Sequence, residues 1–112
     1  MPNITETMQQ MVNAWNQHDP DKIASFFTED CFYENELAGV VGRGREVVRN
    51  FAESGFKINP DFKVEVTNLF VSENMGAAEG VMTGAHTGQR RYCNIFEHQD
   101  GLIKRVTLYI TK

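Results

Sequence analysis

The sequence lacks the charge pattern and the long apolar runs that mark several functional classes. Its 11 basic residues are outnumbered by 15 acidic ones, which gives a formal net charge of −4, and the basic residues are scattered. Nucleic-acid binding needs a clustered positive field, so we expect no nucleic-acid partner. No apolar run approaches the length of a membrane-spanning helix, and MPNITETMQQ shows no signal-peptide pattern. We therefore expect a cytoplasmic protein with no membrane partner.

Cysteine and metal-ligand motifs are also scarce. The only two cysteines, Cys31 and Cys93, form no CxxC motif, and we expect two reduced thiols. The three histidines and the acidic residues show no metal-ligand spacing such as HxxxH. A Gly-rich phosphate loop and a nucleophile elbow are both missing. We predict no metal site and no cofactor.

The residues that are present describe an ordinary globular protein. Hydrophobic residues make up 41% of the 112, and charged residues 23%. A chain of this length forms one domain, which we place at residues 1–112, and buries roughly two-thirds of its unfolded surface. Eight Phe, three Tyr and one Trp can fill a core and line a cavity.

The first half of the sequence has helical patterns. Asn3 and Glu6 resemble a capping box ahead of an apolar stripe that repeats at helical spacing. Asp19-Pro20 caps and starts a short second helix. A short strand is expected at 31–37, and AGVVGRG reads as a turn into a third helix, GREVVRNFAES, which Gly55 should end.

From Asp61 onward the apolar period changes to two, which is typical of strands. In the first of these strands Phe62, Val64, Val66 and Phe70 should share one face. Turns at 73–76, 87–88 and 99–101 separate four strands in an antiparallel meander. The predicted fold class is α+β, with a curved sheet around the helices that forms a cone with an open end.

Four strings of the sequence resemble a known superfamily: AWNQHDPDKIASFFTEDCFYEN, GRGREVVRNF, GAHTG and FEHQDGLIKRVTLY. In this order they are similar to the nuclear transport factor 2-like proteins, especially the branch with SnoaL-like polyketide cyclases, ketosteroid isomerases and limonene epoxide hydrolases. The resemblance covers nearly the whole chain. It implies the cone-shaped roll, also called cystatin-like, in which a curved, mostly antiparallel (mixed) sheet wraps around three N-terminal helices.

The resemblance to ketosteroid isomerases implies three roles. Their proton-abstracting Asp corresponds to Asn35, their Tyr donor to Met11, and their protonated Asp donor to Asn94. An Asn amide cannot accept a proton at useful pH, but it can donate a hydrogen bond. Asn94 therefore keeps its role, and the base is missing unless Glu34 or Glu36 replaces it.

The resemblance to limonene epoxide hydrolases is carried by Tyr33-Glu34-Asn35, which matches their water-positioning Tyr-x-Asn segment. That family also uses an Asp-Arg-Asp arrangement. The segment 78–82, AEGVM, replaces the Arg and the first Asp, and Leu108 replaces the second. This sequence therefore does not carry that mechanism.

Strand alternation predicts what lines the inside of the cone. A mostly apolar surface with a few polar groups is typical of small-molecule sites. The expected lining is Met11, Trp15, Tyr33, Asn35, Met82, His86, Tyr92, Asn94 and Leu108.

Several of these residues can also be interpreted as having only a structural role. Trp15 fits a core position, the Tyr33 hydroxyl could face solvent, and His86 fits an exposed turn. Glu34 and Glu36 point away from the cavity by alternation, although a bulge could bring one inward. Burial there would raise its pKa toward that of a general base.

We predict a small-molecule-binding domain of the SnoaL-like or ketosteroid isomerase-like type, with an unknown small apolar ligand. If it is an enzyme, it acts by acid–base catalysis on a small apolar carbonyl compound. The candidate catalytic residues are Glu34, Asn35, Asn94 and His86. The alternatives are a non-catalytic ligand-binding domain and a protein-interaction module. Because Cys93, Ile95, Leu69 and Val71 should face outward, and because the superfamily commonly pairs through this face, we also expect a homodimer.

Overall fold

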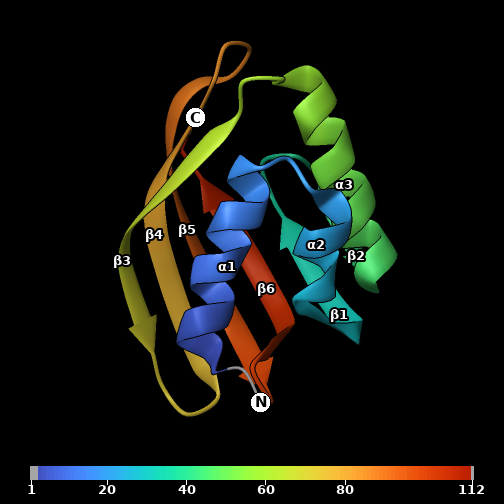
Figure 1. Cartoon of the computed structure of the whole chain (residues 1–112), viewed down its shortest axis with the longest axis vertical. Helices are drawn as coiled ribbons and strands as arrows, with labels where there is room; N and C mark the ends of the chain where they lie inside the picture. The colour runs from blue at the N-terminus through green and yellow to red at the C-terminus, as the bar shows by residue number, and fades with distance from the viewer. Residues whose placement is uncertain (1–2, 112) are drawn as a thin grey trace.

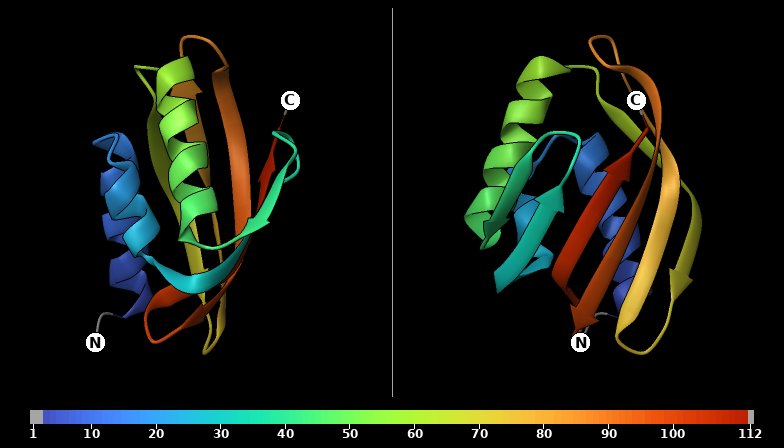
Figure 2. Two further views of the ribbon diagram at one scale, coloured as in Figure 1. Left: turned by 90° about the vertical axis from the view of Figure 1, so that its right-hand side faces the viewer. Right: turned by 180° about the vertical axis from the view of Figure 1, so that it is seen from behind.

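The computed structural model describes residues 3–111. The chain forms a curved six-stranded sheet with three helices on its inner face (Figures 1 and 2). The helices are α1 (Ile4–Asn16), α2 (Pro20–Ser25) and α3 (Arg45–Ile58). The strands are β1 (Phe27–Asn35), β2 (Val40–Arg43), β3 (Lys63–Val71), β4 (Met75–Gly84), β5 (Gly88–Gln99) and β6 (Leu102–Ile110). The predicted α+β cone is confirmed.

The helix starts follow the capping signals in the sequence. The Asn3 side chain accepts a hydrogen bond from the Glu6 backbone N–H at 2.9 Å and caps α1. Asp19 does the same for the Lys22 N–H at 3.1 Å, with Pro20 as the first residue of α2. Apolar residues of both helices join the buried core, in which Ile23 is fully buried.

The sheet joins the first strand of the chain to the last. Its order is β2-β1-β6-β5-β4-β3, visible from the outer face in Figure 2 (right). Only the β1–β6 pairing is parallel among the described strands. It places Asn35 beside Leu108 and Tyr33 beside Val106. The core lies between this inner face and the helices.

Three predicted boundaries are wrong. The segment 38–44 is not only a turn, because Val40–Arg43 pairs with β1 as strand β2. Strand β1 begins at Phe27 rather than at residue 31. Helix α3 continues through Gly55 to Ile58, and the residue ahead of Pro60 ends it, since a residue before proline avoids helical conformation.

The predicted faces of β3 change at Thr67. A β-bulge between Val66 and Asn68 shifts the register with β4 by one residue, and a one-residue shift moves every later side chain to the opposite face. Leu69 therefore packs against the core, and Phe70 is 61% exposed on the outer face. The expectation that Phe70 faces inward, with Leu69 and Val71 outward, is wrong.

Side chains from the end of α1 pair with the edge strand β3. The Asn16 amide donates to the Val64 C=O at 3.0 Å and accepts from the Val64 N–H at 2.7 Å. The His18 imidazole Nε2 lies 2.8 Å from the Phe62 C=O. Asn16 thus supplies the two hydrogen bonds that a neighbouring strand would make at this position.

Replacing Asn16→Leu should lower the free energy of unfolding by about 2 kcal/mol, because two hydrogen bonds to Val64 are lost at about 1 kcal/mol each. Urea unfolding measures this change. Asn13→Leu is the control, because Asn13 is exposed on the same helix. Equal effects of the two substitutions would show that the bonds to Val64 contribute nothing.

Candidate functional site

Two rows of side chains on the inner sheet face carry the polar groups that the sequence singled out. In the first row Leu108 lies between Asn35 of β1 and Asn94 of β5. In the second row Val106 lies between Tyr33 and Phe96. Strands are spaced at about 4.8 Å, so the two asparagine Cα atoms are roughly 10 Å apart.

Three atoms of this surface are buried without a hydrogen-bond partner among residues 3–111. They are the Tyr33 hydroxyl oxygen, the Asn35 Nδ2 and the Asn94 Oδ1. A buried polar atom left unpaired costs about 1–3 kcal/mol, so such atoms are rare in native proteins. They lie on β1 and β5, the two strands that flank β6, and this makes the surface a candidate place for a polar ligand group. We call Tyr33, Asn35 and Asn94 the inner polar cluster.

The orientation of the Asn35 amide is fixed by the turn that follows β1. Its Oδ1 accepts a hydrogen bond from the Ala38 backbone N–H at 3.1 Å. The side chain is 1% exposed, and its Nδ2 is therefore the end left without a partner within the described chain. Asn35 thus presents a donor, and it contributes no charge at any pH.

Burial keeps the two inner phenols protonated. It raises the pKa of Tyr33 well above the usual phenol value. The Asn35 amide lies close enough to the hydroxyl to offset part of that shift, although the two groups do not meet hydrogen-bond geometry. Burial also raises the pKa of Tyr92 to about 12, with a further contribution from Cys93. Tyr33 is therefore a neutral hydroxyl that can donate or accept a hydrogen bond at physiological pH.

The residues predicted to form the apolar lining divide between the core and the sheet surface. Met11 is buried in the core, and Trp15 packs against Phe56 and Phe62 with ring centroids 5.5 and 5.7 Å apart. On the sheet the lining members are Met82 and Leu108, which are half-buried, and Tyr92, which is buried. Leu108 therefore lies next to the inner polar cluster, whereas Trp15 is part of an aromatic contact in the core.

The ionisable candidates lie elsewhere. Glu34 is on the outer face, as alternation predicts, where its Oε1 accepts a hydrogen bond from the Thr107 hydroxyl at 3.2 Å. Glu36 is exposed, and His86 is exposed in the β4–β5 turn, held through its backbone N–H by Asn59. The structure therefore does not bring Glu34 or His86 together with Asn35 and Asn94.

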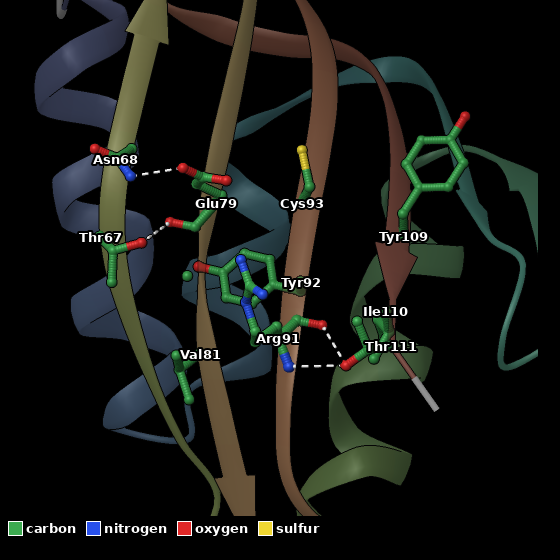
Figure 3. Close-up of a pocket in the computed structure, with 11 residues that line it drawn as sticks. Thr67, Asn68, Glu79, Val81, Arg91, Tyr92, Cys93, Tyr109, Ile110 and Thr111 are labelled. Carbon is green, nitrogen blue, oxygen red and sulfur yellow. Dashed lines mark hydrogen bonds between the residues drawn. The ribbon is translucent and has the colours of Figure 1, made fainter.

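A hollow of about 600 Å³ lies on the outer face of the sheet (Figure 3). In it the Asn68 amide donates to the Glu79 carboxylate at 2.6 Å, and the Arg91 side chain extends over β4. Strand alternation does not predict this hollow, because the bulge turns Thr67 and Asn68 outward together. The only indication of the bulge in the sequence is that two consecutive polar residues, Thr67 and Asn68, interrupt the alternating pattern of the strand.

A second hollow, of about 490 Å³, lies between α1 and β3, beside Met8, Val12 and Leu69. Neither hollow is lined by a member of the inner polar cluster. Within residues 3–111 no group of His, Cys, Asp and Glu side chains is arranged to hold a metal ion. No helix in the same part of the chain has the length and apolarity needed to cross a membrane.

The SnoaL-like domain model matches residues 8–106 of the chain. No curated protein matches the chain in sequence.

Solved structures share the fold at low identity. A cystatin-fold protein from Novosphingobium aromaticivorans has a TM-score of 0.83 at 20% identity, over 97% of this chain and 98% of its own. A protein with a ketosteroid isomerase-like fold from Catenulispora acidiphila, in complex with trimethylamine, has a TM-score of 0.86 at 17% identity, over 93% and 84%. A SnoaL-like protein from Burkholderia thailandensis has a TM-score of 0.80 at 20% identity, over 97% and 95%.

The raised pKa values predict a loss of stability in alkali. In the unfolded chain phenols ionise near pH 10, whereas in the folded chain Tyr92 stays protonated to about pH 12 and Tyr33 is shifted in the same direction. The unfolded state then binds fewer protons, so stability falls as pH rises above about 10.

Tyr33→Phe should remove part of this alkaline loss. At pH 7 its free energy of unfolding should stay within about 1 kcal/mol of the wild type, because the deleted hydroxyl makes no hydrogen bond within residues 3–111. Above about pH 10 the variant should be the more stable protein. Thermal unfolding from pH 7 to 11 measures both effects, and parallel curves for the two proteins would contradict the prediction.

Proposed function

The chain belongs to the SnoaL-like domain family, and we propose that it binds a small, mostly apolar molecule whose polar group is held by the inner polar cluster. One observation supports this function above others: three polar atoms are buried on one sheet face without a partner within residues 3–111. A ligand that pairs with them recovers the free energy that their burial costs.

The donors and acceptors of the cluster define the polar group. Asn35 Nδ2 donates, the Tyr33 hydroxyl donates or accepts, and Asn94 Oδ1 accepts. A ketone or hydroxyl oxygen can take the hydrogen bond from Asn35, and a hydroxyl can also donate to Asn94. The cluster itself holds no charged group, so it suits a neutral oxygen rather than an anion.

Binding without proton transfer is the form of this function that the geometry supports best. General acid–base catalysis needs a group within hydrogen-bond reach that changes protonation near neutral pH. The ionisable candidates from the sequence, Glu34 and His86, lie on the outer face and in an exposed turn. Asn35 and Asn94 would then hold and orient a ligand rather than exchange protons with it.

The fold is compatible with a small ligand. The Catenulispora acidiphila protein shares the fold and is in complex with trimethylamine, a small molecule with a single polar atom. A protein at 17% identity does not transfer its ligand, and the residues of this chain define their own chemistry.

We also propose that two copies of the chain pair through the outer sheet face. Phe70, Ile95 and Tyr109 expose 61%, 45% and 46% of their surfaces there, beside half-buried Cys93. They project from β3, β5 and β6, and β4 lies between β3 and β5 in the sheet. An apolar surface of this kind is unusual on a free monomer.

The double variant Asn35→Leu/Asn94→Leu should weaken binding of 2-decanone, a neutral apolar ketone, by at least roughly tenfold, because a good hydrogen bond contributes about this factor. Isothermal titration calorimetry measures the affinity. The wild-type affinity should not vary between about pH 4 and 8, since amides and phenols do not titrate there. A titrating group in that range would instead support the acid–base alternative.

The control for this experiment is Asn68→Leu, the same substitution on the outer face of the sheet. It should leave the affinity for 2-decanone unchanged. If the double variant binds 2-decanone as tightly as the wild type, the inner polar cluster is not the binding site.

Ile95→Glu should convert a dimer into a monomer at micromolar concentration, because it places a charge in the apolar outer face. Analytical ultracentrifugation distinguishes the two states. Ile58→Glu is the matched control, since Ile58 is 55% exposed on α3, away from the sheet. A wild-type protein that is monomeric at these concentrations would refute the pairing.

A further inference from the structure

Arg90 lies at the start of β5 on the same strand face as the inner polar cluster. It pairs in register with Met82, and by alternation it shares the inner face with Tyr92 and Asn94. Asn94 is four positions after Arg90, which corresponds to about 13 Å along a strand. Arg90 is thus the one cation of β5 that lies in line with the proposed binding surface.

The guanidinium of Arg90 is held in place by the backbone. Its Nε donates to the Thr87 C=O at 3.1 Å, and its Nη1 donates to the Thr111 C=O at 3.0 Å. The side chain is half-buried. Among residues 3–111 no carboxylate lies within 4.0 Å of it, although the chain has more acidic than basic residues.

Two carbonyl bonds use two of the five N–H donors of an arginine and fix the plane of the guanidinium. The other three donors are available to an anion. A planar, oriented and partly dehydrated guanidinium recognises carboxylates better than a freely moving cation does, because less side-chain entropy is lost on binding. Because Arg90 lies at the end of the inner face, its guanidinium can bind an anionic group at one end of an elongated ligand.

We propose that the ligand is an amphipathic carboxylate. Its carboxylate binds Arg90, its apolar chain crosses Tyr92 and Leu108, and its neutral ketone or hydroxyl oxygen accepts a hydrogen bond from Asn35. A hydroxyl also donates to Asn94. This inference rests on the proposed function and adds the ligand class and the residue that selects it. A run of methylene groups between the carboxylate and the neutral oxygen lets such a ligand reach from Arg90 toward Asn94.

The neighbouring arginine provides a contrast. Arg91 follows Arg90 directly but extends over the outer face, where it is exposed (Figure 3). On α3, Arg49 is paired with Asp21 at 2.7 Å and with Glu53 at 2.6 Å, so its charge is compensated within the protein. Arg90 combines an inward position with backbone anchoring.

The test compares two ligands that differ only in the group at one end. In 9-oxodecanoate the terminal methyl of 2-decanone is replaced by a carboxylate, and the ketone and chain are kept. Calorimetry on the wild-type protein should show 9-oxodecanoate binding at least roughly tenfold more tightly than 2-decanone, the contribution of a charge-assisted hydrogen bond. Its methyl ester, which has no charge, should lose this preference.

Arg90→Met should abolish the preference for the carboxylate and leave the affinity for 2-decanone unchanged. Arg91→Met is the matched control and should keep the preference. Equal binding of 9-oxodecanoate and its methyl ester to the wild-type protein would overturn the inference without any variant. Loss of the preference in Arg91→Met as well would also overturn it, because the effect would then come from overall charge.

Failure of this inference is distinguishable from failure of the proposed function. If 2-decanone binds and depends on Asn35 and Asn94, but the carboxylate adds nothing, only the role of Arg90 is refuted. If 9-oxodecanoate binds equally well to the wild type and to Asn35→Leu/Asn94→Leu, the inner polar cluster does not hold the ketone, and both are refuted.

Discussion

The parallel pairing of β1 with β6 is the contact on which the rest of the molecule depends. It joins residues near the start of the chain to residues near its end, and it sets Asn35 beside Leu108. Because loop closure costs entropy before such distant contacts form, this pairing must be stabilised by the burial of its neighbours, such as Cys31 and Ile103. Without it β1 would leave the sheet, and Asn35 and Asn94 would no longer flank one residue.

The inner polar cluster lowers the stability that this pairing supports. Buried polar atoms without partners carry a free-energy cost that a purely apolar row would avoid. Surfaces of this kind persist where function outweighs stability. The amides of Asn35 and Asn94 provide directional hydrogen bonds without the larger cost of burying a charge. That difference explains how a cone of this size can keep polar groups on its inner face.

The sequence predicted the inner face of β4, β5 and β6 because strict alternation assigns each side chain to one face, and Asn94, Met82 and Leu108 follow it. It predicted the wrong faces for Leu69 and Phe70, because a bulge is set by backbone pairing with β4 and leaves the local apolar pattern nearly unchanged. Strand β2 was missed because a four-residue strand has too short a pattern to separate it from a turn. The role of Arg90 depends on carbonyls of Thr87 and Thr111, which no pattern of side chains reveals.

The edge position of β3 makes the side chain of Asn16 important beyond the single molecule. An unpaired edge strand offers its N–H and C=O groups to any other extended chain, and sheets can grow from one molecule to the next in this way. Asn16 and His18 occupy part of that edge from within the same chain, at Val64 and Phe62. The side-chain amide at the end of α1 thus protects part of the edge strand β3, and this helps to prevent the sheet from acting as a template for aggregation.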